Sequence, residues 1–311
     1  MKRTSRNSHK PVCLSSTALC YFAFMELKRD LAIVLRSVPF EDRHRVVTAI
    51  TENHGQISAL ARNAIQSRRF GGTLELFAAA EWTFADKQGA ELCGLRDAVI
   101  RRSFEGIRAD FDCLSLASVL SELMLKVAPQ RTSAPELFRL HSNSLAVLEE
   151  RGADLRILNT YLAKLLQWNG TQPRLQACSG CAIPLDQVEE GAELTCLVAS
   201  AGWLCSKCRR DGLAHVQGGS DTGFQQAQIR LAPLGILDFQ VSVALPIRQA
   251  SRAAQAGRKD QLDLFRFLEA LLAYHLPGLD RQPLKALRFL GIESSLSPQP
   301  ENPPRNRPLR S

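Results

Sequence analysis

Two pairs of cysteines limit what this chain can fold into more than any other feature of its sequence. Cys178 and Cys181 form one Cys-x-x-Cys pair, Cys205 and Cys208 form a second, and 23 residues separate the pairs. Two intervening residues allow a tight turn that points both thiolates at one ion, so the four sulfurs predict a tetrahedral zinc site. Because four protein ligands leave no coordination position open for water, the predicted site is structural and not catalytic.

Disulfides or unrelated buried thiols are the alternative interpretation of the same cysteines. The chain also contains Cys13, Cys20, Cys93 and Cys113 without evident partners, which fits a reducing cytoplasm where disulfides rarely persist. We therefore favour one structural zinc ion. Cys196 lies between the two pairs, and we interpret it as a small buried apolar residue.

The spacing of apolar residues predicts strands in the first third of the chain. From Glu26 to about Ser103 apolar and polar residues alternate, and glycines at 55, 71, 72 and 89 interrupt the alternation as turns. The expected strands centre on 31–35, 46–50, 57–61, 76–84 and 92–100. Five short strands favour a small barrel, of which the OB type is the common five-stranded form. An SH3-like barrel and a sandwich fit the same spacing.

Helical spacing replaces this alternation beyond about residue 105. Helices are expected over 116–127, from Pro135 to 148 and over 155–166, with Gly170 as the stop of the third. Further helical regions are expected at about 224–232, 260–274 and 284–290. The sequence thus predicts an α+β fold, with an N-terminal OB-fold β-barrel over 25–104 and an α-helical domain over 105–292. A zinc-finger segment over 176–212 is expected inside the helical domain.

The two ends of the chain have a different composition. Residues 1–24 begin with basic residues and a mildly apolar run that superficially resembles a signal peptide, but Ser15, Ser16 and Thr17 interrupt the run. We interpret this segment as a disordered extension or a start codon assigned too early. Residues 293–311 hold five prolines and three arginines, which predicts a disordered basic tail. No apolar stretch approaches about 18 residues, so we expect a cytoplasmic protein without a membrane span.

Basic residues are the main indication of a binding partner. The formal net charge is +8, which favours a polyanion and nucleic acid first, although solubility alone explains such a charge. Guanidinium groups match phosphate oxygens, and few aromatic platforms predict backbone binding with weak sequence preference. A solvated charged rim is the alternative. The candidate nucleic-acid-binding residues are Arg36, Arg43, Arg45, Arg62, Arg68, Arg69 and Phe70, with Phe70 and Phe40 as the candidate stacking platforms.

Sequence motifs of enzymes do not favour a catalytic function. The chain has no Gly-x-x-x-x-Gly-Lys-Ser/Thr loop for nucleotide phosphates, no Gly-x-Ser-x-Gly elbow and no His-Glu-x-x-His helix. Its histidines are scattered, and its adjacent glutamate pairs are typical of solvated surfaces. We therefore expect a binding protein and not an enzyme.

Several segments, in this order, resemble the bacterial RecO family of recombination mediator proteins. They are AIVLRSVPFEDRHRVVT at 32–48, TENHGQISALARNA at 51–64, SRRFGG at 67–72, LRDA at 95–98, YLAKLL at 161–166, the Cys178/Cys181 pair and PLKALRFL at 283–290. The resemblance covers about residues 25–292. Asn63 stands where the family usually has glycine, and asparagine tolerates the positive φ expected there. The connection over 65–73 is too short for the α-helix found in many OB folds.

The resemblance implies a fold and a function. It implies an OB barrel, a helical domain and a zinc-finger insertion. It also implies binding to single- and double-stranded DNA, annealing of complementary strands, and loading of RecA, together with RecR, onto strands coated by single-stranded-DNA-binding protein. The family has no catalytic residues to transfer to this chain. A bacterial nucleoid location follows from these activities.

The helical domain is expected to dock protein partners. A short acidic and apolar tail, such as that of single-stranded-DNA-binding protein, requires an apolar groove with a cation at its mouth. Arg156 and Lys164 on the third expected helix are the candidates. A zinc-stabilised RNA-binding or transcription adaptor is the alternative function, and a nuclease is a weaker one.

Overall fold

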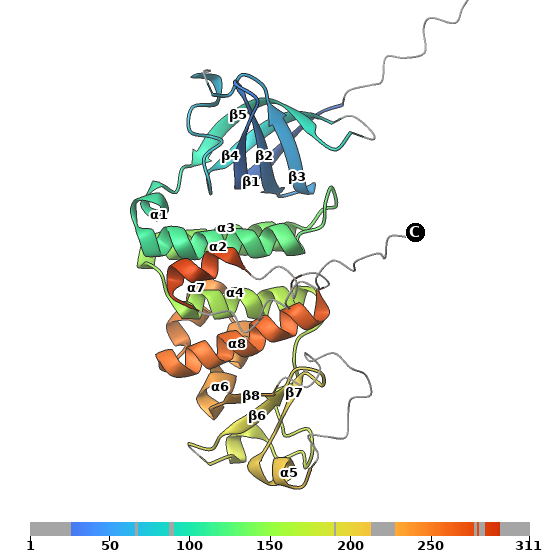
Figure 1. Ribbon diagram of the computed structural model, residues 1–311, viewed down its shortest axis with the longest axis vertical. Coiled ribbons are helices and arrows are strands. Elements are labelled where there is room, and N and C mark those ends of the chain that lie inside the picture. Colours follow the sequence, from blue (N-terminus) through green and yellow to red (C-terminus); the bar gives the residue numbers. More distant parts are fainter. Residues whose placement is uncertain are drawn as a thin grey trace, which may run out of the picture.

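The structure is a computed structural model that describes residues 26–65, 68–86, 90–189, 191–212, 228–276, 279 and 284–292. Figure 1 shows three parts along the long axis of the molecule: a β-barrel at one end, helices in the middle, and a small sheet with helix α5 (Ser206–Arg210) at the other end. The expected N-terminal extension over 1–24 and the expected tail over 293–311 lie outside the described residues.

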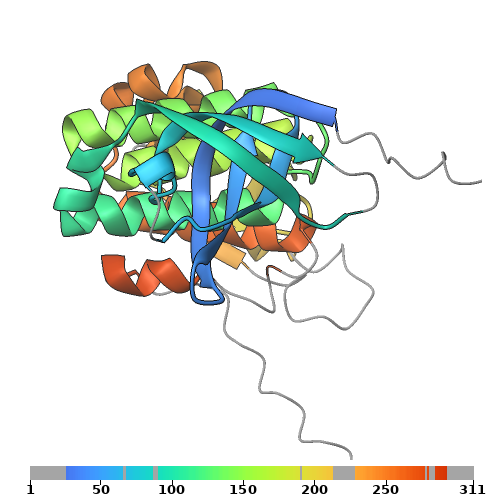
Figure 2. The ribbon, with the colours of Figure 1, turned by 90° about the horizontal axis from the view of Figure 1, so that it is seen from above.

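Five strands close the barrel. The strand order is β1-β2-β3-β5-β4, in which β1 pairs antiparallel with β4 and β3 pairs parallel with β5. This arrangement is that of an OB-type barrel, so the expected mixed α+β fold with an N-terminal barrel is confirmed. Figure 2 looks down on the barrel, which lies over the helices. The strands are β1 (Glu26–Phe40), β2 (His44–Thr51), β3 (Gly55–Ala61), β4 (Ala79–Asp86) and β5 (Cys93–Arg102).

Alternation along β4 shows why these segments form strands. Ala80, Trp82 and Phe84 are buried in the barrel, whereas Glu81 and Thr83 between them are half-buried on its outer face. The strand begins at Ala79 and not at 76 as the sequence suggested. Phe77 has a φ of 69°, and this left-handed conformation ends the extended backbone before the strand starts.

The connection between β3 and β4 agrees with the prediction from the sequence. Its described part contains a single 3₁₀ turn, η1 (Arg68–Phe70), in place of an α-helix. Asn63 has a φ of 56°, as expected for a residue at a usual glycine position, and its backbone N–H donates to Nδ1 of His44 at 2.9 Å. The turn after β3 therefore forms without glycine.

Helices follow the barrel, and capping residues or a proline mark where several of them begin. Asp110 accepts a hydrogen bond from the Cys113 N–H at 2.7 Å, and Asp154 accepts one from the Arg156 N–H at 2.8 Å, so each aspartate caps a helix. Pro135 occupies a first helical position, where its missing N–H costs nothing. The helices are α1 (Glu105–Ala109), α2 (Phe111–Val127), α3 (Pro135–Arg151) and α4 (Leu155–Trp168).

The sequence prediction of a helix over 224–232 is wrong in its described part. Gln228–Leu231 is strand β8, which pairs antiparallel with β6 (Leu194–Leu197). Ile229 and Leu231 alternate with polar residues, so four residues of period two were mistaken for a helical turn. Three helices follow β8: α6 (Pro233–Ala244), α7 (Ile247–Ala253) and α8 (Arg258–His275); a 3₁₀ helix, η4 (Lys285–Leu290), comes later. Only α8 and η4 among these were expected.

The barrel contacts the helices through apolar packing at its base and through hydrogen bonds from the α2–α3 loop. Ile33, Ile50 and Phe77 at the base of the barrel belong to the same buried cluster as α2 and α3. In the loop between α2 and α3, Arg131 donates to Asp86 Oδ1 at 2.8 Å and to the Glu91 carbonyl oxygen at 3.3 Å. The loop thus holds both ends of the β4–β5 connection, which fixes the barrel on the helical layer.

The far end of the molecule is a three-stranded antiparallel sheet. Its order is β7-β6-β8, with β7 (Gly202–Leu204) on one edge. Trp203 and Cys196 are fully buried and pack into the cluster formed by the helices, and the Trp203 indole N–H donates to the Leu175 carbonyl at 3.1 Å. The sheet is therefore anchored to the helical core. The segment that follows β7 carries Cys205 and Cys208 of the metal site.

Candidate metal centre and nucleic-acid interface

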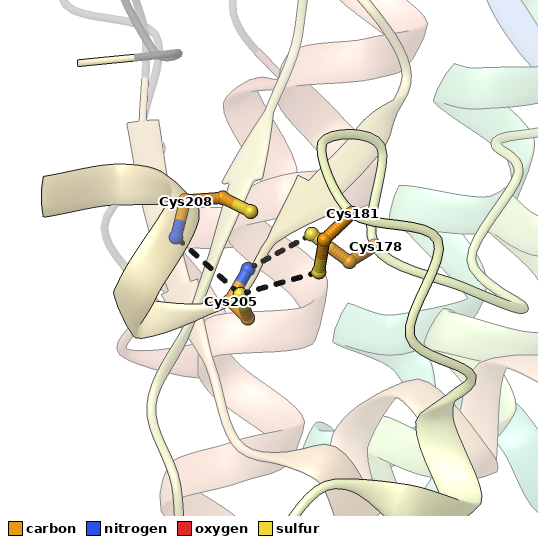
Figure 3. A group of neighbouring side chains, drawn as sticks. All are labelled: Cys178, Cys181, Cys205 and Cys208. Atoms are coloured by element: carbon orange, nitrogen blue, oxygen red, sulfur yellow. Dashed lines mark hydrogen bonds between the residues drawn. The ribbon is translucent and has the colours of Figure 1, made fainter. Parts of the chain in front are cut away.

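The four paired cysteines converge on one point, as Figure 3 shows. Cys178 and Cys181 lie in a turn after α4, Cys205 follows β7 directly, and Cys208 lies in α5. Their sulfur atoms are all within 4.8 Å of one another, and those of Cys181 and Cys205 are 3.8 Å apart. Zn–S bonds of about 2.3 Å in a tetrahedron place sulfurs about 3.8 Å apart, so the cluster has the dimensions of a four-thiolate zinc site.

Backbone N–H groups prepare the cluster for a cation. The N–H groups of Gly180 and Cys205 lie 3.4 and 3.3 Å from the Cys178 sulfur, and the Cys208 N–H lies 3.4 Å from the Cys205 sulfur. Burial alone would raise the pKa of Cys178, but the N–H groups of Cys181, Cys205 and Gly180 stabilise its thiolate and lower its pKa to about 7. Burial and the neighbouring sulfurs raise the pKa of Cys208 to about 12. Metal binding requires thiolates, so the donor set fits a divalent metal ion.

Cys196 is not part of this cluster. It is fully buried in β6, and burial raises the pKa of its thiol. The sequence interpretation of Cys196 as a small buried apolar residue is confirmed. The four ligands named from the sequence are thus brought together, and they could hold one metal ion.

The arginines named from the sequence do not form one group. Arg36 on β1 and Arg43 in the β1–β2 turn are exposed. Arg45 on β2 is half-buried and donates to the Ser37 hydroxyl at 3.2 Å, with Glu75 3.5 Å away. The side chain of Arg68 lies outside the described part of the structure.

Two of the named arginines share a cleft with one that the sequence analysis missed. Arg62, Arg69 and Arg96 line a cleft of about 370 Å³ at the parallel β3–β5 pairing, and the paired residues Leu60 and Gly94 line it too. Arg96 is exposed beside Asp97, although alternation would hide one of the two, because the β4–β5 register shifts at this point. Two successive polar residues inside an alternating strand are the signal that could have indicated it.

Phe70 requires a correction. Its ring is only 3% exposed and packs in the barrel core, so a base cannot stack on it. The guanidinium of Arg69 lies 5.7 Å from the centre of that ring, and Arg69 also lies 4.0 Å from Asp97. Phe40, at the end of β1, is 44% exposed and remains available as a platform. The sequence suggested that Arg69 and Phe70 are exposed together, but only Arg69 is exposed.

Lys164 lies in an apolar groove of about 340 Å³ between α3, α4 and α7. Leu140, Trp168 and Ile247 form apolar walls, and the Lys164 ammonium donates to the Val243 carbonyl oxygen. Burial lowers the pKa of Lys164. Arg139 adds a second, exposed cation to the lining, and it lies 3.5 Å from Glu136, which lines the same groove.

Arg156 faces a different cleft. It lines a cavity of about 470 Å³ beside Asp112 and Arg258, where the beginnings of α4 and α8 meet η4. Its guanidinium lies 3.4 Å from the Asp154 carboxylate and donates to the Ala256 carbonyl at 3.4 Å. The two cations named as partner-binding candidates therefore do not share one groove.

The chain is a modular α+β protein: a five-stranded OB-type barrel is joined to a helical layer, and a four-cysteine cluster that could hold a metal lies at the far end. Among its described residues, no helix is long and apolar enough to cross a membrane. Family comparisons are more specific. Residues 25–104 match the N-terminal model and residues 108–220 the C-terminal model of recombination protein O. The chain belongs to the RecO family of DNA repair and recombination mediator proteins.

Individual relatives agree with the family models over most of the chain. The DNA repair protein RecO of Anaeromyxobacter dehalogenans (strain 2CP-C) is 33% identical over 86% of this chain and 96% of its own length. The protein of that name from Desulfatibacillum aliphaticivorans is 31% identical over 83% of this chain and 94% of its own length. The DNA repair protein RecO of Pelobacter propionicus is 34% identical over 67% of this chain and 82% of its own length.

Proposed function

We propose that this protein binds single- and double-stranded DNA through its barrel and anneals complementary strands without catalysis. The observation that carries the proposal is the cleft over β3 and β5, which Arg62, Arg69 and Arg96 line together, with Asp97 4.0 Å from Arg69. Annealing is opposed by repulsion between two polyanions. Arginines that neutralise phosphates without gripping bases leave the Watson–Crick edges free to pair.

Membership of the family extends the proposal to partners. We propose that the barrel, residues 25–104, is the DNA-binding domain and that residues 105–292 dock proteins in the bacterial cytoplasm. With RecR, the protein would help load RecA onto strands coated by single-stranded-DNA-binding protein. The apolar groove beside Lys164 and Arg139 has the chemistry to hold an acidic and apolar tail of the coating protein. The four cysteines would hold one structural zinc ion.

A titration of single-stranded DNA, duplex DNA and RNA tests the binding proposal. The variant Arg62→Ala/Arg96→Ala removes two phosphate contacts, and each contact with a single strand contributes about 0.7 to the slope of log affinity against log salt. The slope should therefore fall by about 1.4 and the affinity at low salt by about tenfold. Arg230→Ala, on β8 at the far end, is the matched control. Unchanged affinity in the double variant would remove the cleft from the DNA site, and preference for RNA would favour an RNA-binding adaptor.

Annealing of coated strands tests the groove separately. Lys164→Ala should slow annealing when the strands carry single-stranded-DNA-binding protein and leave annealing of naked strands unchanged. Equal rates on coated strands for the variant and the native protein would exclude the groove as the docking site.

A further inference from the structure

Four arginines from three elements gather at one corner of the molecule, outside the barrel cleft. They are Arg102 at the end of β5, Arg151 at the end of α3, and Arg248 and Arg252 on α7. We call this set the arginine corner. Arg102 donates to Glu149 at 2.7 Å and Arg248 donates to Glu150, so two carboxylates lie among the four guanidinium groups.

The arginine corner keeps an excess of positive charge. Arg151 donates to the Ser251 hydroxyl at 3.0 Å and to the Arg248 carbonyl at 3.1 Å, and neither Arg151 nor Arg252 forms an ion pair with a carboxylate of the described chain. Burial, and then the positive charges of Arg252 and Arg248, lower the pKa of Arg151. Like charges held this close are relieved when a polyanion binds them.

Strand β5 connects this corner to the barrel cleft. Arg96 lines the cleft and Arg102 belongs to the corner, so the two sites are separated by about 20 Å along the strand, at about 3.3 Å per residue. Between them Val99 and Ile100 are 51% and 43% exposed, and Arg101 is exposed beside its partner Glu81. Val99 lies on the outer face of β5 with Asp97 and, on the neighbouring strand, Glu81, whereas Ile100 lies on the opposite face across from Ala80. The outer face thus offers one apolar contact for an unpaired base, between cations and beside two carboxylates.

We propose that a single strand of nucleic acid leaves the barrel cleft along β5 and continues onto the arginine corner. The inference rests on the proposed DNA-binding function and extends its site from the barrel onto the helical layer. Phosphates contact the arginines, and Val99 on the outer face of β5 lies under a base. A strand held along this path is extended, with its pairing edges open to a second strand.

Strand length separates the corner from the cleft. The lower limit of an OB-barrel site is about 4 nucleotides. An oligonucleotide of about 4 thymidines, which spans about 14 Å at about 3.4 Å per nucleotide and does not cover the distance to the corner, therefore tests the cleft, and one of about 30 tests the whole path. Arg252→Glu reverses an exposed charge at the corner, and Arg230→Glu makes the same change on β8 at the other end of the molecule. Fluorescence anisotropy would measure affinity for both lengths, and thermal melting would verify that both variants are folded.

The expected result is a loss of about fivefold or more for the long strand with Arg252→Glu and less than about twofold for the short one, with Arg252→Gln intermediate. Arg230→Glu should leave both affinities nearly unchanged. Equal affinities of Arg252→Glu and Arg230→Glu for the long strand would overturn the path, as would an equal loss for both lengths. If the native protein bound neither length, the proposed DNA-binding function itself would fail, which is a different result.

Discussion

His141 places a polar ring inside the helical layer. Its Nδ1 lies 3.1 Å from the Tyr161 hydroxyl, and that hydroxyl donates to the Leu120 carbonyl oxygen at 3.3 Å. Because the Tyr161 hydroxyl proton is donated to the Leu120 carbonyl oxygen, Nδ1–H of His141 must donate to the tyrosine oxygen. The Nε2 atom is then a buried acceptor without a partner in the described structure. Burial lowers the pKa of His141 to about 3, so the ring is neutral near pH 7.

This neutral histidine should make the protein acid-sensitive. The folded ring resists protonation down to about pH 3, whereas the unfolded ring binds a proton below its ordinary pKa of 6.5. The unfolded state therefore binds more protons between these values, and stability falls as pH falls, by about 1.4 kcal/mol between pH 7.5 and 5.5. Urea unfolding at both pH values would measure the loss.

His141→Asn is the matched variant, because asparagine keeps a donor for Tyr161 and does not titrate. Its stability should change less than that of the native protein over the same interval, by about 1.4 kcal/mol. An identical pH dependence in both proteins would show that His141 is not the titrating group.

At the scale of single residues, the sequence predicted the metal ligands better than the nucleic-acid contacts. A Cys-x-x-Cys pair encodes its own turn, so Cys178 and Cys181 could be assigned without the fold. Phe70 could not be placed in the same way, because its exposure depends on how η1 folds back onto the barrel. Arg96 was missed because a strand register shift, which only pairing reveals, turns it outward.

Among the elements, the barrel and the α2–α3 loop approach each other closely at Gly55. It begins β3 with a φ of 64°, and a Cβ atom built there would lie 2.0 Å from the Thr132 carbonyl oxygen and 2.6 Å from that of Pro129. Both atoms are backbone of the α2–α3 loop, and the Gln56 N–H donates to the Pro129 carbonyl at 2.9 Å. A side chain at this position would push the loop off the barrel.

Gly55→Ala should therefore destabilise the joint more than backbone strain alone would. Gly72 provides the control, since its φ is 73° but a Cβ there meets nothing within 4 Å. Gly72→Ala should cost about 1–2 kcal/mol for the left-handed conformation, and Gly55→Ala about 1–3 kcal/mol beyond that for the forced displacement. Chemical unfolding of both variants measures the difference. Equal costs would mean that the loop moves away freely.

Long elements with one buried face were predictable, and short or uniformly apolar ones were not. The strands of the barrel are seven residues or longer, β4 alternates between buried and half-buried residues over most of its length, and α8 carries polar residues on one side over 18 residues. By contrast, α6 is apolar along most of its 12 residues and α7 has only seven, so neither shows a clear helical period. The strand β8 has four residues and is specified by its pairing with β6.

At the scale of the whole molecule, the barrel and the small sheet with α5, which hold the two candidate sites, lie at opposite ends, as Figure 1 shows. The barrel has a buried core of its own around Trp82, Phe84 and Val47, and only its base, at Ile33, Ile50 and Phe77, belongs to the core of the helices. The metal module contributes Trp203 and Cys208 to the helical core instead. A disturbance at the cysteines should therefore spread into the helices before it reaches the barrel.

Replacing one metal ligand tests this division. Cys178→Ser should lose the zinc ion and at least about 3 kcal/mol of stability in the helical part, since structural zinc contributes its binding free energy to folding. Because the barrel core and the cleft arginines are untouched, affinity for a short single strand should stay within about twofold of native. Cys196→Ala, in strand β6 beside the cysteine cluster, should keep the metal and lose only a small buried group. Elemental analysis, thermal melting and an anisotropy titration on the three proteins decide the matter: zinc retained by Cys178→Ser contradicts the ligand assignment, and strand affinity that falls together with zinc content contradicts the independence of the barrel.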